Sequence, residues 1–164
     1  MSALHTSSPS LFIAGRHAVV LSEKAAFDAK RRFELQIDGL LRGEVSLTEY
    51  SQPGVAVGPL AAAIWGGMMV YIAPFAGGRI DRFAQQDEIH AAYPIDDSWC
   101  LVGEVSVVLF DPVGGHERSR YDHDEIILRH RWADNRLLLE DLQGRQFALA
   151  MGGDGQISRS AQQP

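Results

Sequence analysis

Alternating apolar and polar side chains, rather than a helical period, dominate this chain and predict β-strands along most of its length. Phe33, Leu35 and Ile37 alternate with polar residues, which is the pattern of a half-buried strand. Asp38-Gly39 follows as a typical two-residue hairpin turn. Downstream, short apolar runs are separated by turn residues at intervals of about eight to twelve positions. We therefore predict an all-β fold of antiparallel strands.

The segment before this strand has a mixed pattern. Residues 11–21 are an apolar run of strand type. Residues 22–32 have features of a short helix, because Ser22 can cap its N-terminus, Glu23 lies in its first turn and three basic residues lie near its end. We predict one short helix at residues 22–32, and a long hairpin is the alternative.

A repeat of 37 residues organises the centre of the chain. Residues 66–104 and 103–141 share nine identities in 39 positions. The matches include a Gly-Gly pair and an Asp-Glu-Ile run in each copy, at 77–78 and 87–89 in the first and at 114–115 and 124–126 in the second. A repeat of this length is usually one supersecondary unit that packs against its neighbour. Each copy reads as an antiparallel β-meander with an acidic turn before its third strand.

These meanders resemble propeller-type blades over roughly residues 53–151. The resemblance implies blade-like sheets, while a three-unit open meander, a small sandwich and a small barrel remain alternatives. A full ring needs at least four blades, for which we expect this chain to be too short. We predict one β-rich domain at residues 11–154, a disordered N-terminus at 1–10 and a flexible tail at 155–164.

Residues 50–78 contain no charged side chain in 29 positions. Their prolines and glycines divide the segment into pieces of strand length, which indicates buried strands rather than a membrane span. A small-ligand-binding β-barrel lined by this segment is one functional alternative.

The composition is that of an ordinary soluble protein, with 46% hydrophobic and 22% charged residues. Cys100 is the only cysteine, so the chain has no internal disulfide, which suits a reducing compartment. The polar N-terminus lacks the pattern of a signal peptide. We expect a cytoplasmic protein with no membrane partner.

Charge is concentrated in the second half. Residues 81–141 hold fourteen Asp and Glu against six Arg, a net charge of −8. Nucleic-acid backbones attract Lys and Arg, so this balance argues against a nucleic-acid partner. An acidic surface instead favours fast association with a basic protein.

A histidine-rich and acid-rich stretch offers the best candidate for metal chemistry. Imidazole and carboxylate groups are the ligands of zinc and related ions, and His116, His123 and Asp122 or Asp124 could converge across a turn. We expect no cofactor, with a divalent metal at these residues as the alternative. That alternative would make the chain a metal-dependent enzyme or a metal-binding protein.

No Gly-x-Ser-x-Gly elbow and no phosphate-binding glycine loop occurs in the sequence, which favours a non-enzyme. Our leading hypothesis is a protein-binding module, an inhibitor or immunity-type protein that neutralises a basic partner. A homodimer is a further option, because open sheet edges invite pairing. The candidate contact residues are Asp96, Asp97, Asp122, Asp124, Glu125 and Trp132.

Overall fold

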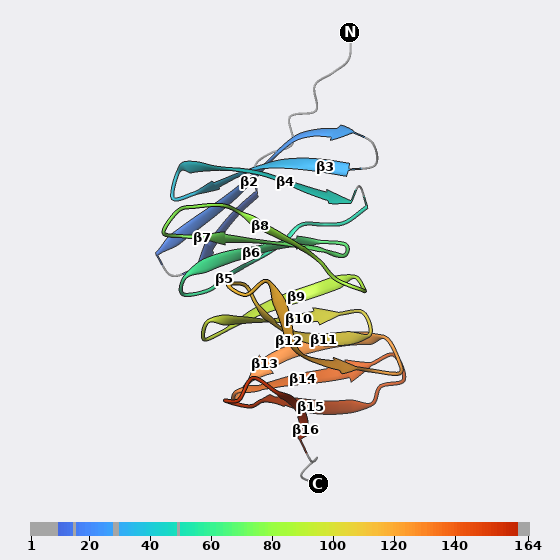
Figure 1. Ribbon diagram of the computed structural model, residues 1–164. Coiled ribbons are helices and arrows are strands. Elements are labelled where there is room, and N and C mark those ends of the chain that lie inside the picture. Colours follow the sequence, from blue (N-terminus) through green and yellow to red (C-terminus); the bar gives the residue numbers. More distant parts are fainter. Residues whose placement is uncertain (1–9, 15, 28–29, 49, 161–164) are drawn as a thin grey trace. The chain divides into compact units, whose positions relative to one another are not determined.

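The computed structural model describes residues 10–160 apart from 15, 28–29 and 49, and all regular structure among them is β-strand. Sixteen strands form four antiparallel sheets of four strands, and in each sheet the pairing follows sequence order (Figure 1). The all-β meander architecture predicted from the sequence is therefore confirmed. The chain forms two compact units, with the boundary between Ala84 and Gln85.

The first unit contains two sheets. Sheet one consists of β1 (Ser10–Ala14), β2 (His17–Phe27), β3 (Lys30–Ile37) and β4 (Leu40–Thr48). Sheet two consists of β5 (Gly54–Val57), β6 (Ala61–Gly66), β7 (Met69–Pro74) and β8 (Asp81–Ala84). The segment without charge therefore supplies β5, β6 and β7, whose side chains contribute to the core of this unit.

The helix predicted at residues 22–32 is wrong. Residues up to Phe27 belong to β2, and β3 begins at Lys30, so the long hairpin is the observed structure. The reason is tertiary: Val19 and Leu21 are buried, and the guanidinium of Arg31 donates to the carboxylate of Glu23 at 2.8 Å across the two strands. Burial and cross-strand pairing override weak helical propensity.

A tyrosine clamp joins the two sheets of the first unit. Tyr71 on β7 is 5% exposed, and its hydroxyl donates to the carbonyl of Ser46 on β4 at 2.6 Å. The same oxygen accepts the amide of Ser46 at 3.2 Å. This pairing satisfies both backbone groups of a β4 residue from the neighbouring sheet.

Replacing Tyr71 with phenylalanine should destabilise the protein by about 1–2 kcal/mol, because the Ser46 amide and carbonyl lose their partner. Chemical denaturation would measure the loss. Tyr50→Phe is the matched control, since Tyr50 is 92% exposed and its replacement should leave the midpoint unchanged. Equal stability of the two variants would contradict a structural role for the clamp.

The second unit also contains two sheets. Sheet three consists of β9 (Ile89–Ile95), β10 (Ser98–Gly103), β11 (Ser106–Asp111) and β12 (His116–Asp122). Sheet four consists of β13 (Ile127–Ala133), β14 (Arg136–Asp141), β15 (Gln146–Met151) and β16 (Ile157–Ser160). The tail predicted from residue 155 onward therefore includes a paired strand, since β16 pairs with β15.

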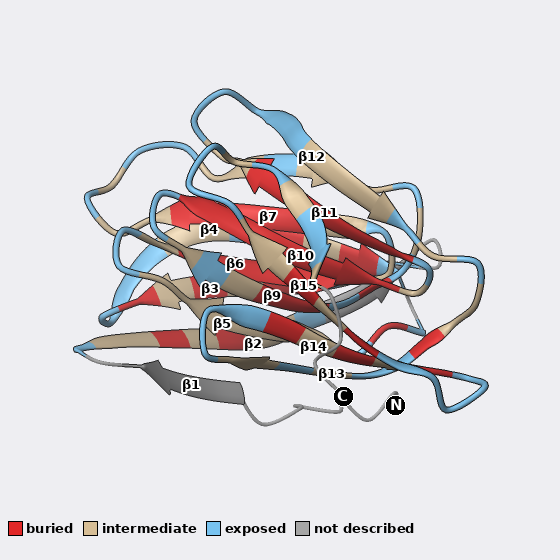
Figure 2. Cartoon of the chain, turned by 90° about the horizontal axis from the view of Figure 1, so that it is seen from below, coloured by how far each residue is buried: buried red, intermediate tan, exposed pale blue. Residues whose placement is uncertain are grey.

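Burial differs between the two sheets of the second unit. Every residue of β10 is buried, whereas β14 alternates between buried and partly exposed positions (Figure 2). The two sheets share a core of alternate side chains from both, formed by Ala91, Cys100, Val102, Val107, Ile127, Leu137, Leu139, Phe147 and Leu149. Cys100 is an apolar member of this core, and burial raises the pKa of its thiol to about 12.

The sequence repeat is displaced relative to the sheets. Its first copy covers β7 to β10 and its second covers β11 to β14, so each copy contains the second half of one sheet and the first half of the next. β11 lies 37 residues after β7, whereas β14 ends at Asp141, 38 residues after Gly103 at the end of β10. One extra residue in the second copy therefore makes Glu125, not Asp124, the structural equivalent of Asp87.

The predicted disordered N-terminus lies outside the described residues except for Ser10, the first residue of β1. Among the described residues, no helix is long and apolar enough to cross a membrane.

Candidate functional site

The hairpin connections of the second unit divide its candidate residues between two ends. The β9–β10, β11–β12, β13–β14 and β15–β16 connections lie at one end, because each strand reverses the direction of the one before it. The β10–β11, β12–β13 and β14–β15 connections lie at the other. Asp96, Asp97 and Trp132 belong to the first end, and Asp122, Asp124 and Glu125 to the second.

A cleft of about 640 Å³, called here the Trp132 cleft, opens at the first end. Its lining combines carboxylates, an arginine, an indole and glycine backbone, contributed by Asp96, Asp97, Arg118, Trp132, Asn135, Gly152, Gly153 and Gly155. The structure thus brings together three of the six predicted contact residues. They come from the β9–β10 turn and from the end of β13, which are more than thirty residues apart.

Tight hairpins set the geometry of this cleft. Asp96 has φ 52°, and Asp134 and Asn135 have φ 51° and 57° in the β13–β14 turn. Aspartate and asparagine tolerate this left-handed region better than other side-chained residues. The turn conformation therefore favours Asp and Asn at these positions, and the same residues bring polar side chains to the cleft.

Arg118 is the cation of the cleft. Its guanidinium contacts the carboxylate of Asp111 at 3.1 Å and that of Asp97 at 3.4 Å. The hydrogen bond with Asp111 is the main reason that the pKa of Arg118 is raised, and the Gly114 amide is the main reason that the pKa of Asp111 is lowered. Asp111 is therefore the main ion-pair partner of Arg118, and the contact with Asp97 is longer and weaker.

Aromatic side chains support the Trp132 wall. The ring of Tyr93 lies 6.0 Å from that of Trp132, and the Tyr93 hydroxyl contacts His130 Nδ1 at 2.8 Å. Burial, followed by the charge of His90, lowers the pKa of His130. The lowered pKa favours a neutral imidazole beside Tyr93.

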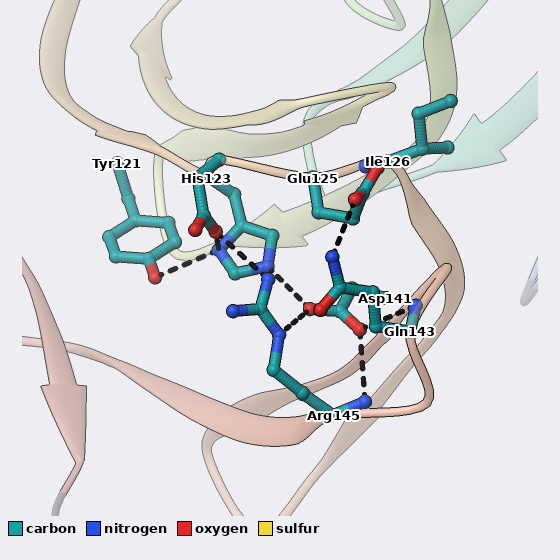
Figure 3. Close-up of polar contacts among 8 residues, drawn as sticks. Tyr121, His123, Glu125, Ile126, Asp141, Gln143 and Arg145 are labelled. Atoms are coloured by element: carbon teal, nitrogen blue, oxygen red, sulfur yellow. Dashed lines mark hydrogen bonds and ion pairs between the residues drawn. The ribbon is translucent and has the colours of Figure 1, made fainter.

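At the opposite end, a buried carboxylate organises the connections between strands (Figure 3). Asp141 is 0% exposed, and His123 Nε2 contacts its Oδ2 at 3.0 Å. Arg145 donates to Asp141 through Nε at 2.6 Å and through its amide at 2.9 Å, and the Gln143 amide donates at 3.0 Å. We call these four residues the Asp141 clamp, which ties the β12–β13 connection to the β14–β15 turn.

The three predicted acids at this end serve the same connections. Asp124 accepts from Arg145 at 3.0 Å, and Glu125 accepts from the Gln143 side chain at 2.9 Å. Asp122 is 73% exposed and lies 3.6 Å from Arg120. Asp124 and Glu125 therefore have side-chain partners within the protein. Asp96 at the Trp132 cleft has no side-chain hydrogen bond or ion pair with the described residues.

The structure does not assemble the predicted metal ligands into one site. His116 begins β12, and His123 lies just beyond the end of that strand, so the length of a seven-residue strand separates them. Among the described residues, no group of three or more His, Cys, Asp or Glu side chains is arranged to hold a metal ion. His123 instead contacts Asp141, and Asp122 pairs with Arg120. His116, His123 and Asp122 therefore do not converge in this structure.

Residues 50–78 do not line a β-barrel, which was the alternative architecture for this segment. That segment forms three strands of an open four-stranded sheet, and Ala62, Ile64 and Tyr71 from it are buried in a packed core. A barrel would need a sheet that closes on itself.

Sequence reasoning missed Asp141 and Arg145. Asp141 meets His123, 18 residues away, and Arg145 meets Asp124, 21 residues away, only when neighbouring strands and sheets pack together. The only sequence signal was the acidic residue at the end of an apolar strand, which is also a common feature of ordinary turns.

No protein-family model and no curated protein matches the sequence. Solved structures do match the fold. A chain in the crystal structure of the mitotic checkpoint complex superimposes with a TM-score of 0.63 at 10% identity, covering 93% of this chain and 51% of that one. The WD40 domain of Toxoplasma gondii coronin gives a TM-score of 0.55 at 7% identity, with 82% of this chain and 40% of that chain covered.

The computationally designed Ika4 protein gives a TM-score of 0.61 at 14% identity, with 90% of this chain and 94% of that chain covered. This chain thus spans about half of the matched chain in the checkpoint complex and nearly all of the designed protein. At these identities the likeness concerns the fold alone. The sheets are of the kind found in WD40-type β-propellers, as the blade resemblance of the repeats implied.

Proposed function

We propose that this chain is a non-catalytic protein-binding module that recognises a basic partner through the acidic surface of its second unit. The observation that carries the proposal is the Trp132 cleft, where Asp96 and Asp97 lie beside an indole. Tryptophan is enriched among residues that dominate binding energy, and carboxylates accept charge-assisted hydrogen bonds from basic side chains. The fold is compatible with this function, because a chain of the mitotic checkpoint complex, which is a protein assembly, has a similar fold.

The charge distribution supports a basic partner. Residues 85–164 carry fourteen Asp and Glu against seven Arg, a net charge of −7. Four of the seven arginines of this unit form ion pairs with acids, but Glu88, Glu104, Asp96 and Asp134 have no ion-pair partner within the described part of the chain. Such unpaired carboxylates raise the association rate with a basic surface.

We further propose that this chain neutralises the activity of its basic partner. A module that covers a basic active surface acts as an inhibitor or immunity-type protein, and the cytoplasm is the compartment that we propose for it. A different protein is a better partner than a second copy. The edge strand β12 begins at His116 and carries the exposed charged residues Glu117 and Arg118, and charged side chains on an edge oppose strand pairing between copies.

Binding to the partner should weaken about tenfold or more when the salt concentration rises from 50 to 300 mM, because exposed charges are screened over about 6–14 Å in this range. Partners are first captured from the native host at low salt and identified. The affinity of each purified partner for this chain is then measured, and so is the partner's activity with and without this chain. Neutralising Asp96, Asp97 and Glu88 together should reduce the salt dependence.

Glu44→Gln is the matched control, since Glu44 is an exposed acid of the first unit and its loss should leave the affinity unchanged. A partner whose affinity ignores salt and all three acids would contradict recognition by the acidic surface. A partner whose activity is unaffected by binding would contradict the neutralising role alone.

A further inference from the structure

We propose that the Trp132 cleft receives a single arginine side chain of the partner protein, with its guanidinium against the Trp132 indole and the carboxylates of Asp96 and Asp97. This inference rests on the proposed protein-binding function and specifies its central contact. It depends on the shape and mixed chemistry of the cavity as well as on its acids.

The cavity has the size and lining that an amphipathic cation needs. A volume of about 640 Å³ accommodates a long side chain with space for water. Ile95, Leu109 and Met151 line it together with Trp132, so the methylene groups of the guest would contact apolar surface. The polar groups of Asp96 and Asp97 lie on the same lining and would face the charged head group.

The charges around the cleft leave room for one additional cation. Asp96, Asp97 and Arg118 are the charged side chains of its lining. Asp111 lies directly behind Arg118 and forms the shorter of its two contacts, 3.1 Å against 3.4 Å for Asp97. Asp111 therefore compensates Arg118, which leaves two carboxylates at the cleft without a full-strength partner.

A guanidinium fits this arrangement better than an ammonium group. It is planar, so it can stack on an indole, and its parallel N–H groups match the two oxygens of a carboxylate. Ser98 Oγ donates to Asp97 Oδ1 at 3.1 Å, which fixes the orientation of that carboxylate and leaves Oδ2 for the guest. Lysine offers neither the flat face nor the paired donors.

The test uses three short peptides with blocked termini, Gly-Arg-Gly, Gly-Lys-Gly and Gly-citrulline-Gly. Nuclear magnetic resonance follows the indole N–H of Trp132, which Trp132→Phe identifies. We expect the arginine peptide to shift this signal saturably with a dissociation constant in the millimolar range. Loss of one charge-assisted hydrogen bond should weaken the arginine peptide about tenfold in Asp97→Asn. Asp96→Asn should act in the same direction without disturbing the turn, because asparagine also adopts positive φ.

Asp134→Asn provides the matched control. Asp134 directly follows β13 as Asp96 directly follows β9, and its φ of 51° matches the 52° of Asp96, but it does not line the cleft. Its replacement makes the same change in net charge and should leave the affinity within twofold of the unchanged protein. Equal weakening by Asp134→Asn and Asp97→Asn, or equal binding of the lysine or citrulline peptide, would overturn the proposal.

The two levels of the proposal fail separately. If a purified partner binds in a salt-dependent manner while the arginine peptide does not shift Trp132, the arginine contact is wrong and the protein-binding function stands. If the peptide binds the cleft but no protein partner binds this chain, the function is wrong and the cleft retains its guanidinium preference.

Discussion

Replacing Asp141 with alanine is expected to lower the melting temperature by about 10 °C or more, the largest effect of any single change at the candidate sites. The carboxylate accepts hydrogen bonds from two backbone amides, from His123 and from the Arg145 side chain. Its removal leaves the His123 ring, whose side chain is 6% exposed, and two part-buried amides without an acceptor, and it leaves Arg145 without its nearest anion. Breaking a buried, hydrogen-bonded charge network is among the most destabilising mutations known in proteins.

Thermal unfolding followed by circular dichroism measures this effect. Asp141→Asn should cost less than alanine, because the amide oxygen retains one acceptor. Asp122→Ala is the control at the same end of the second unit, since Asp122 is 73% exposed and its loss should shift the midpoint by no more than about 2 °C. A midpoint unchanged in Asp141→Ala would show that the clamp does not stabilise the fold.

The same carboxylate predicts how stability depends on pH. Burial alone raises the pKa of Asp141, but hydrogen bonds from His123 and Arg145 outweigh burial and hold the pKa far below its ordinary value. The unfolded chain therefore binds a proton near pH 3.9, where the folded chain does not. The stabilisation is fully present above this pH and is lost progressively as the pH falls below about 4, and the loss should be smaller in Asp141→Asn.

Local patterns in the sequence were sufficient for strands and turns. Phe33, Leu35 and Ile37 alternate as predicted and are buried, and Asp38-Gly39 forms the predicted turn with φ 53° and 78°. These features depend on neighbours along the chain, so the sequence contains them directly. The helix at residues 22–32 failed because cross-strand contacts, which local propensity does not report, decide that segment.

The candidate site was predictable in part for the same reason. Asp96, Asp97 and Trp132 each lie at a recognisable strand end, and the hairpin order alone places these strand ends on one side of the second unit. His116 and His123 are far apart because β12 runs unbroken between them. The sequence alone did not show that this strand is continuous. Which acids are bound by arginines depends on packing between sheets and has no signature in the sequence.

The structural neighbours share the fold at 7–14% identity, so they share backbone geometry with few side chains in common. A β-meander sheet needs only alternating apolar side chains and tight turns, which many unrelated sequences supply. The partner of this chain must therefore be inferred from residues that the fold does not require. Asp97 meets that condition, because its side chain is 66% exposed and its backbone φ is not positive.

Gly103→Ala is expected to destabilise the protein by about 2–3 kcal/mol, because an added Cβ would overlap the carboxylate of Asp87. That carboxylate accepts the Val105 amide and the Ser106 hydroxyl, each at 2.9 Å, and its displacement would leave both without their acceptor. Gly103 ends β10 as Asp141 ends β14. In sheets three and four, one carboxylate therefore lies at the end of the second strand. In sheet three it is Asp87, from the connection before β9, and in sheet four it is Asp141, from β14 itself.

A double-mutant cycle tests this equivalence. In an Asp87→Ala background the carboxylate is absent, so Gly103→Ala should cost about 1 kcal/mol or less, and the two substitutions should be clearly non-additive. Gly39→Ala is the matched glycine control, because nothing lies within 4 Å of an added Cβ there and its cost arises only from the backbone, with φ 78°. Its effect should be independent of Asp87. Additive costs for Gly103→Ala and Asp87→Ala would mean that the glycine serves the strand end itself and not the carboxylate beside it.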